Sequence, residues 1–253
     1  MVCAVTNPDK PVGRDALLTS SPVKTLAMNH GIPVFTPLTV RGNTELFDTL
    51  RAFECDYFIV VAYGRILPNE ILDMPKKMCI NIHGSILPKY RGASPIQSAL
   101  LHGEEVTGVT IMEMSEGMDE GDILKIREIP IDKNEMSGTL FEKFAEISGI
   151  TLLDTLKELE HGGITPLPQD SKLATYCTKI TKEDGLVSWD MTAKELYNKW
   201  QAYNPWPGIF TIYDEKRLLL ERVDYMDEVN GIANSPGMVV KLSDGSIAIT
   251  CSK

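Results

Sequence analysis

The chain has 253 residues, of which 43% are hydrophobic and 24% charged, a composition typical of folded globular proteins and not of disordered or fibrous ones. This length suits two domains. The formal charge of −10 argues against indiscriminate nucleic-acid binding, which depends on neutralising phosphates. The negative excess lies in residues 101–253, whereas residues 1–100 carry a slight positive excess, so an RNA partner would have to be contacted locally.

Targeting and metal signals are missing from the sequence. The apolar runs are far shorter than the roughly 20 residues that cross a bilayer, and no secretion leader precedes them. We therefore expect a cytoplasmic protein without a membrane partner. The five cysteines and four histidines show no metal-ligand spacing, which predicts neither a disulfide framework nor a bound metal.

Apolar strands alternate with helices in the first part of the chain. The predicted strands are residues 2–6, 32–35, 57–62 and 78–82, and the predicted helices are residues 22–29, 43–53 and 69–74. Ser21 before Pro22 has the form of a helix N-cap. Residues 7–14 contain two prolines and a glycine and are expected to be irregular. Continuous apolar strands that alternate with helices predict an α/β fold with a mostly parallel sheet, covered on both faces.

The pattern continues with a helix, two strands and a long helix. Residues 94–97 read as a capping box that opens a helix to about residue 102. Residues 107–114 and 122–131 are predicted strands, and residues 137–160 form a long amphipathic helix that Gly162 and Gly163 end.

A polar, proline-containing segment at residues 165–173 predicts the domain boundary, which gives a first domain at 1–165 and a second at 173–253. A helix is expected there at residues 192–202. Four short strands follow, at residues 210–213, 218–223, 238–242 and 246–251. Short strands separated by turns favour a small β-barrel.

Asn81 and His83 stand at the end of the fourth predicted strand, and alternation places both on one face. Ligands of open parallel sheets lie just outside the carboxyl ends of the strands. An amide donor beside a titratable imidazole at that edge suits acyl transfer, because the two can stabilise an oxyanion. The residues alone leave a second interpretation open, in which His83 is a hydrogen-bonded core histidine and Asn81 a turn former.

Five carboxylates crowd residues 113–122, between two predicted strands. The run can be a solvated acidic hairpin loop. Alternatively, one of its carboxylates orients His83 and favours the charged imidazole. Spacing does not choose between the five.

Five motifs follow one another along the chain: Asn81-x-His83, Ser85-Ile86-Leu87-Pro88, Tyr90-Arg91-Gly92-Ala93, Gly108-Val109-Thr110 and Met118-Asp119-x-Gly121-Asp122. In this order they resemble the active-site signature of the 10-formyltetrahydrofolate-dependent formyltransferases. Further motifs resemble the branch of this family that acts on initiator tRNA: Asn7-Pro8-Asp9-Lys10-Pro11-x-Gly13-Arg14, Ser21-Pro22-Val23-Lys24, Val61-Ala62-Tyr63-Gly64-x-Ile66-Leu67-Pro68 and Asn204-Pro205-Trp206-Pro207-Gly208.

The resemblance implies a Rossmann-like, mostly parallel formyltransferase domain followed by a small OB-like β-barrel domain. It implies transfer of the formyl group of 10-formyltetrahydrofolate to the α-amino group of methionyl-initiator tRNA, in translation initiation and without a metal. The partners it implies are folate and this tRNA, and we expect a monomer without a protein partner.

The family's catalytic residues correspond to Asn81, His83 and Asp119. Its folate-contacting residues correspond to Tyr63, Gly64, Ile66, Leu67, Ser85, Ile86, Leu87 and Pro88, together with the loop around residues 115–119. Arg14 matches the basic residue of a loop that reaches toward the tRNA acceptor stem.

Members of this family begin a few dozen residues earlier, with a strand that enters the middle of the sheet, and their barrel continues by further strands. We therefore expect a chain truncated at both ends, with unpaired strand edges in the first domain and an incomplete barrel. Three other functions fit the same motifs: formyl transfer to a nucleotide-sugar amine, hydrolysis of formyl-folate, and folate or RNA binding without turnover.

Overall fold

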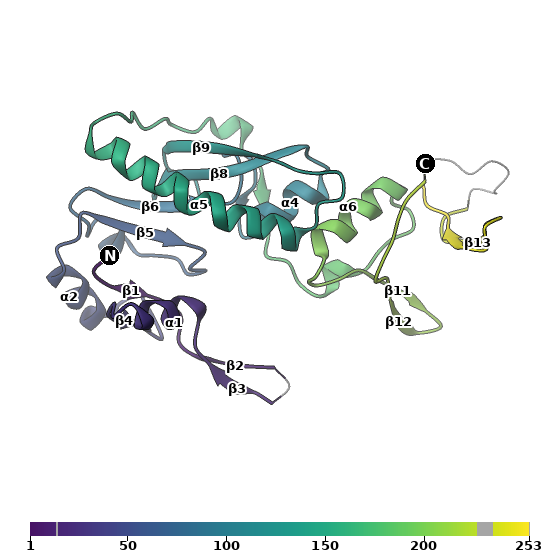
Figure 1. Ribbon diagram of the computed structural model, residues 1–253, viewed down its shortest axis with the longest axis horizontal. Coiled ribbons are helices and arrows are strands. Elements are labelled where there is room, and N and C mark those ends of the chain that lie inside the picture. The colour runs from purple at the N-terminus through teal and green to yellow at the C-terminus, as the bar shows by residue number, and fades with distance from the viewer. Residues whose placement is uncertain (14, 227–234, 253) are drawn as a thin grey trace. The chain divides into compact units, whose positions relative to one another are not determined.

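The computed structural model describes residues 1–13, 15–226 and 235–252. The chain forms two compact units, one of residues Met1–Ile82 and Ile111–Asp122 and the other of His83–Thr110 and Ile123–Lys253. Strands β5, β6, β8 and β9 are hydrogen-bonded in that order, and Figure 1 labels the helices and strands. The predicted mixed α/β class is confirmed. Within the described ranges, no helix combines the length and the apolar composition of a membrane-spanning segment.

The first unit contains short strands and three helices. Their bounds are β1 Ala4–Val5, β2 Lys10–Val12, β3 Leu17–Thr19, α1 Pro22–Asn29, β4 Val34–Phe35, α2 Thr44–Ala52, β5 Tyr57–Val61 and α3 Asn69–Leu72, and β6 Met78–His83 ends this part of the chain. β1 pairs with β4 and β5 with β6, both in parallel. The core consists of Val40, Leu46, Phe47, Leu50 and Ile71.

Two helices in this unit begin at residues whose side chains cap them, and the cap at Ser21 is the one that the sequence predicts. The Ser21 hydroxyl accepts a hydrogen bond from the Lys24 amide at 3.1 Å, and Asn43 caps α2 through the Leu46 amide at 3.0 Å. Each cap satisfies one amide that the first helical turn leaves unpaired. The predicted bounds of α1 are confirmed.

The prediction that residues 7–14 are irregular is wrong. Lys10–Val12 pairs antiparallel with Leu17–Thr19, so Pro11 lies in a two-stranded ribbon opposite Leu18. A strand in such a ribbon needs amide donors along one side only, so proline is tolerated where its nitrogen faces outward.

Two edges of the first unit stay open within the described residues. The four-stranded sheet ends at β5, and β1 and β4 form a sheet of their own. On β5, Ile59 is 38% exposed and Val61 is 55% exposed.

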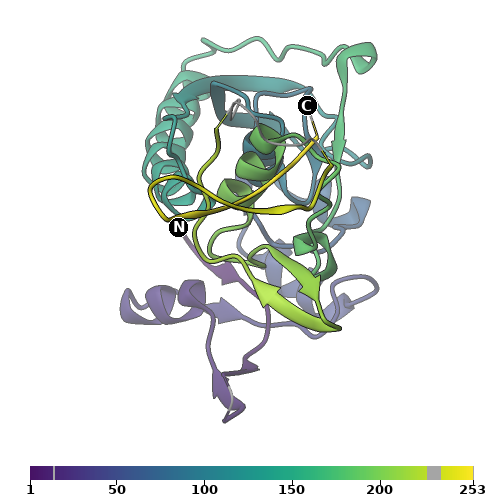
Figure 2. The same ribbon diagram turned by 90° about the vertical axis from the view of Figure 1, so that its right-hand side faces the viewer.

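The second unit holds the longer helices and the C-terminal hairpins. Its elements are β7 Arg91–Gly92, α4 Pro95–Leu101, β9 Ile123–Pro130, α5 Ser137–Glu160, β10 Tyr176–Cys177, α6 Ala193–Tyr203, β11 Phe210–Tyr213, β12 Lys216–Leu219, β13 Val239–Lys241 and β14 Ile247–Ile249, with 3-10 turns at Ser171–Leu173 and Glu183–Gly185. Strand β8, Val106–Glu113, begins in this unit. Helix α5 lies along β9, as Figures 1 and 2 show.

Helix α4 begins at the predicted proline, yet the capping box predicted at residues 94–97 is wrong. The Ser94 hydroxyl donates to the Thr178 carbonyl at 2.5 Å and makes no side-chain cap. Because the hydroxyl is used by a segment 84 residues away, local spacing could not predict its partner.

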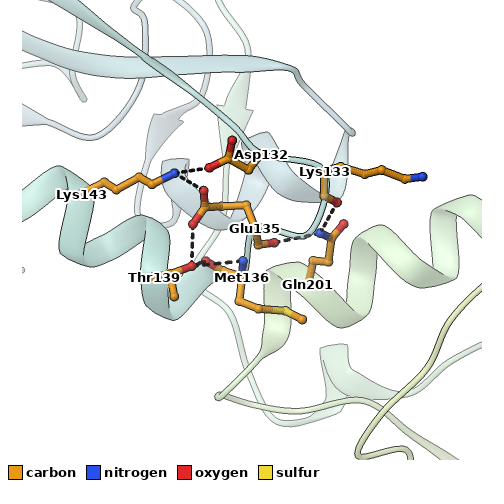
Figure 3. A network of polar contacts seen from close by, with 7 residues as sticks. All are labelled: Asp132, Lys133, Glu135, Met136, Thr139, Lys143 and Gln201. Carbon is orange, nitrogen blue, oxygen red and sulfur yellow. Dashed lines mark hydrogen bonds and ion pairs between the residues drawn. The ribbon is translucent and has the colours of Figure 1, made fainter.

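Helix α6 is fastened to the turn between β9 and α5 by a polar network (Figure 3). The Gln201 amide donates to the carbonyls of Lys133 at 3.0 Å and Glu135 at 2.9 Å. Lys143 pairs with Asp132 at 2.7 Å and with the buried carboxylate of Glu135. Buried polar groups that are fully paired fix one relative placement of their elements.

The last four strands form two antiparallel hairpins, β11 with β12 and β13 with β14. Trp200 of α6 is buried and donates its indole hydrogen to the carbonyl of Glu221, which follows β12, at 3.1 Å. The β-barrel predicted for this region stays a prediction, as does the domain boundary at residues 165–173.

Candidate active site

Strand β6 carries Asn81 and His83 at its carboxyl end. Cys79 and Ile80 before them are buried, and Asn81 is half-buried opposite Val60 of the parallel strand β5. Burial raises the pKa of the Cys79 thiol to about 12, so this sulfur stays protonated at neutral pH. The polar groups that the strand end offers are therefore the amide and the imidazole.

Asn81 meets one carboxylate of the acidic run. Its side-chain nitrogen Nδ2 lies 3.4 Å from Oδ1 of Asp119, which is half-buried. Asp119 adopts a left-handed backbone with φ of 52°, a conformation that non-glycine residues rarely hold without a reason in the surrounding structure. The structure thus joins two of the predicted residues and selects Asp119 from the five carboxylates as a partner of Asn81.

The acidic run is a tight loop between β8 and β9. The Glu113 amide donates to the Asp122 carbonyl at 2.9 Å, and Asn69 donates to Glu116. A Cβ on Gly121 would lie 2.0 Å from the Glu113 carbonyl oxygen, so only glycine fits there. Burial, and then the nearby Asp122, raise the pKa of Glu113.

His83 belongs to the second unit, where it is 5% exposed. Its Nε2 lies 2.9 Å from the backbone carbonyl of Tyr90. The structure therefore satisfies the core-histidine interpretation in part, because the ring is buried and hydrogen-bonded. A buried, oriented imidazole is equally what a catalytic role needs.

The predicted folate residues fall into two groups. In the first unit, Tyr63 and Leu67 pack against the core, and Ile66 is 89% exposed. Gly64 has φ of 72°. Burial raises the pKa of the Tyr63 hydroxyl.

In the second unit, Ser85 and Leu87 are buried, whereas Ile86 and Pro88 are half-buried. The Ser85 hydroxyl donates to the Lys89 carbonyl at 2.6 Å. Its side chain is therefore already used to hold the turn, and the two half-buried residues present more surface to a ligand.

Two residues that hold these groups by hydrogen bonds are not indicated by the sequence. Asn7 donates to the Tyr63 carbonyl at 3.1 Å and accepts from Nε of Arg65 at 2.8 Å. Thr110 donates to the Ser85 carbonyl at 2.6 Å and accepts from the Leu87 amide at 3.2 Å. Both lie inside motifs quoted from the sequence, but nothing in their spacing indicates these partners.

Tyr90 is a further residue whose role the sequence does not indicate. The Tyr90 hydroxyl, and then Lys89, lower the pKa of Glu104, which accepts from both. Arg91 is 2% exposed and donates to Gln169 at 2.8 Å and 3.0 Å.

Arg14 lies outside the described residues, and the hairpin of β2 and β3 flanks it. Among the described residues, no group of three or more His, Cys, Asp and Glu side chains could hold a metal ion. Two open cavities of about 390 and 470 Å³ lie beside α6, lined by Lys133, Tyr197 and Tyr225 among others, and the predicted site residues line neither.

Comparison with known proteins identifies the class. Residues 1–156 match the Formyl transferase model, and residues 179–253 match the model of the Formyl transferase C-terminal domain. The chain is 45% identical to the methionyl-tRNA formyltransferase of Caldicellulosiruptor saccharolyticus, over 97% of this chain and 81% of that protein. The corresponding enzyme of Sulfurimonas denitrificans is 44% identical over 100% of this chain and 80% of its own length. The chain belongs to the methionyl-tRNA formyltransferase family.

Solved structures share the fold at lower identity. HypX from Aquifex aeolicus in complex with tetrahydrofolic acid matches with a TM-score of 0.62 and 24% identity, over 88% of this chain and 38% of HypX. A 4-N formyltransferase from Francisella tularensis matches with a TM-score of 0.66 and 18% identity, over 82% of this chain and 86% of that chain. The formyltransferase fold, with N- and C-terminal domains, is therefore that of this chain.

Proposed function

We propose that this protein transfers the formyl group of 10-formyltetrahydrofolate to the α-amino group of methionine on initiator tRNA. The observation that carries this proposal is the 45% identity to a methionyl-tRNA formyltransferase over 97% of the chain. In the transfer, the amine nitrogen bonds to the formyl carbon and the bond from that carbon to N10 of the folate breaks. The amine loses a proton and N10 gains one, so tetrahydrofolate leaves.

Asn81 and His83 stabilise the negative charge that develops on the formyl oxygen. One amide hydrogen of Asn81 faces Asp119, which leaves the second for this oxygen. His83 supplies a second donor from the same strand end when its ring is charged, at Nδ1, because Nε2 already faces the Tyr90 carbonyl. Asp119 favours this charged form and helps to handle the proton that the amine loses. Donors that are already oriented stabilise a developing oxyanion without reorganising.

The folate donor contacts Tyr63, Gly64, Ile66 and Leu67 from one segment and Ser85, Ile86, Leu87 and Pro88 from another. Buried polar atoms support a polar ligand at the first segment and at the acidic loop. The Tyr63 hydroxyl and the Ser115 hydroxyl are buried and have no hydrogen-bond partner within the described residues. Because such groups are normally paired, a ligand with donors and acceptors fits them.

The tRNA contacts Arg14, which lies in the sequence between β2 and β3. The apolar side chains of Leu17 and Leu18 on β3 are 68% and 72% exposed. A basic residue that the sequence places between these two strands suits a local contact with the acceptor stem, as the acidic overall charge requires.

We propose the folds of the two domains, the oligomeric state and the cellular compartment on the same grounds. The first domain, residues 1–165, is Rossmann-like with a mostly parallel sheet, and the second, residues 173–253, is an OB-like barrel. The protein acts as a monomer in the cytoplasm, where translation begins.

A formyl-transfer assay tests the function. Purified protein, 10-formyltetrahydrofolate and methionyl-tRNA are mixed, and N-formylmethionine is measured after ester hydrolysis. Product that is lost in His83→Ala supports the proposal, with Asn29→Ala on the exposed end of α1 as the control. Transfer to a nucleotide-sugar amine but not to methionyl-tRNA, or release of free formate alone, would replace it with one of the other activities.

A further inference from the structure

The contact between His83 and Tyr90 selects one tautomer of the imidazole. His83 Nε2 lies 2.9 Å from the Tyr90 carbonyl oxygen in a buried setting. A carbonyl oxygen only accepts, so Nε2 carries a hydrogen. In the neutral ring, Nδ1 is then the basic nitrogen, and this second nitrogen is the one that can take up a proton.

The Tyr90 carbonyl points where it does because the backbone of Tyr90 is held in an unusual conformation. Its φ is 59°, in the left-handed region, and the residue is 9% exposed. A bulky residue in that region needs support from its surroundings. The Tyr90 amide donates to Oγ1 of Thr175 at 2.8 Å, and the hydroxyl donates to Glu104 at 2.7 Å.

Thr175 comes from the segment that follows α5, 85 residues further along the chain. The segment is fixed by its backbone as well. The Thr175 amide donates to the Pro88 carbonyl at 3.3 Å and the Arg91 amide donates to the Thr175 carbonyl at 2.8 Å. At Gly92 a Cβ would lie 2.2 Å from the Cys177 carbonyl oxygen, so the two segments are in close contact.

We propose that Thr175 is a positioning residue for His83, because its hydroxyl holds the Tyr90 amide and thereby aims the Tyr90 carbonyl that keeps His83 in the Nε2–H tautomer. This inference rests on the proposed catalytic role of His83. It assigns to the segment after α5 a part in the chemistry, although none of its side chains needs to touch a substrate.

The kinetic test compares two substitutions at one position. Thr175→Val removes the acceptor and keeps the shape, whereas Thr175→Ser keeps the hydroxyl. We expect kcat of Thr175→Val to fall about tenfold, with KM for both substrates changed less than about twofold, since misplacing a catalytic group affects turnover more than binding. Thr175→Ser, and Thr165→Val at an exposed position of the same segment, should resemble the wild type.

The spectroscopic test uses protein labelled with ¹⁵N in its histidines, with the His83 signals assigned from their loss in His83→Gln. We expect the wild-type ring to be protonated at Nε2, and this preference to weaken in Thr175→Val and to persist in Thr175→Ser. Protonation of the neutral wild-type ring at Nδ1 overturns the proposal, and it does so even if Thr175→Val fails to fold.

The two proposals fail separately. Full activity of His83→Ala removes His83 from catalysis, whatever its tautomer. Loss of activity in His83→Ala together with wild-type kcat and an unchanged tautomer in Thr175→Val refutes the role of Thr175 alone.

Discussion

The amide nitrogen of Asn81 and a carboxylate oxygen of Asp119, 38 residues apart in the chain, lie 3.4 Å from each other. A carboxylate accepts but does not donate, so this contact decides which way the Asn81 amide faces. At 3.4 Å the bond is long, and catalytic hydrogen bonds often shorten only when the substrate is bound.

Replacing Asn81 by alanine removes one donor to the developing oxyanion. We expect kcat to fall on the order of 10²- to 10³-fold, the usual cost of one such donor. Steady-state formyl transfer measures the effect, and calorimetry with folate should give an unchanged affinity. Asn29→Ala on α1 serves as the control, and wild-type turnover in Asn81→Ala would exclude the amide from the mechanism.

Asn7→Ala should loosen the segment that carries Tyr63. Asn7 joins the Tyr63 carbonyl to the Arg65 guanidinium, which also donates to the Leu38 carbonyl at 2.6 Å. Two lost hydrogen bonds should lower the free energy of unfolding by about 1–3 kcal/mol. We expect KM for 10-formyltetrahydrofolate to rise several-fold with a smaller change in kcat. An unchanged KM in a destabilised variant would mean that this segment does not bind folate.

Lys143→Met should destabilise the protein in a pH-dependent way. Removing the ammonium leaves the buried Glu135 carboxylate with Thr139 as its side-chain donor, at a cost of about 1–3 kcal/mol. The hydrogen bond from Lys143 lowers the pKa of Asp132 below its ordinary 3.8, and the same contact, with Glu135, raises the pKa of Lys143 above 10.5.

The sign of the pH dependence follows from these directions. Because the pKa of Asp132 is lowered by folding, its carboxylate stabilises the fold above pH 3.8, and this stabilisation is lost as the pH falls through the pKa of the folded state. Because the pKa of Lys143 is raised by folding, its ammonium stabilises the fold below pH 10.5, and this stabilisation is lost as the pH rises through the pKa of the folded state. Urea unfolding should therefore show a constant gap between wild type and Lys143→Met at neutral pH that narrows in acid. An equal loss in the control Lys157→Met, an exposed lysine on α5, would contradict the role of the pair.

Two glycine-to-alanine changes should have opposite effects on stability. Gly149 lies within α5 with open space at its Cβ position, so Gly149→Ala should stabilise by about 0.5–1 kcal/mol. Gly92 has φ of 118°, and a Cβ added there would lie 2.2 Å from the Cys177 carbonyl oxygen, so Gly92→Ala should disrupt the pairing of β7 and β10. Thermal unfolding distinguishes them, and equal melting temperatures would show that the pairing contributes little.

Local sequence signals predicted the helices well because their causes are local. Ser21, Asn43 and Thr192 cap α1, α2 and α6 through amides three residues away. The long helix α5 has the predicted bounds, since its apolar period and the glycines after it lie within one stretch of chain. The strand at Pro11 was not predicted, because the sequence does not show that the residue lies in a two-stranded ribbon, where a proline at an edge position is tolerated.

In the candidate site, only the residues that belong to a recognised sequence motif could be predicted. Asn81 and Asp119 were named from their resemblance to a family signature, and spacing alone could not select Asp119 from its neighbours. The supports of His83 could not be found at all. Tyr90 acts through its backbone carbonyl, which leaves no mark on residue type, and Thr175 depends on a tertiary contact across 85 residues.

The docked segment at Thr175 also limits how this protein can be recombined with its relatives. The residues after the end of α5 still contact the first part of the second unit: Thr175 contacts Pro88 and Tyr90, and the Thr178 carbonyl accepts a hydrogen bond from Ser94. A chimera joined between Glu160 and Thr175 would replace Thr175 and Thr178 together with the C-terminal part, whereas a junction after Thr178 would keep both residues and their contacts. The C-terminal part that can be exchanged without losing these contacts therefore begins after Thr178 and not directly after the end of α5.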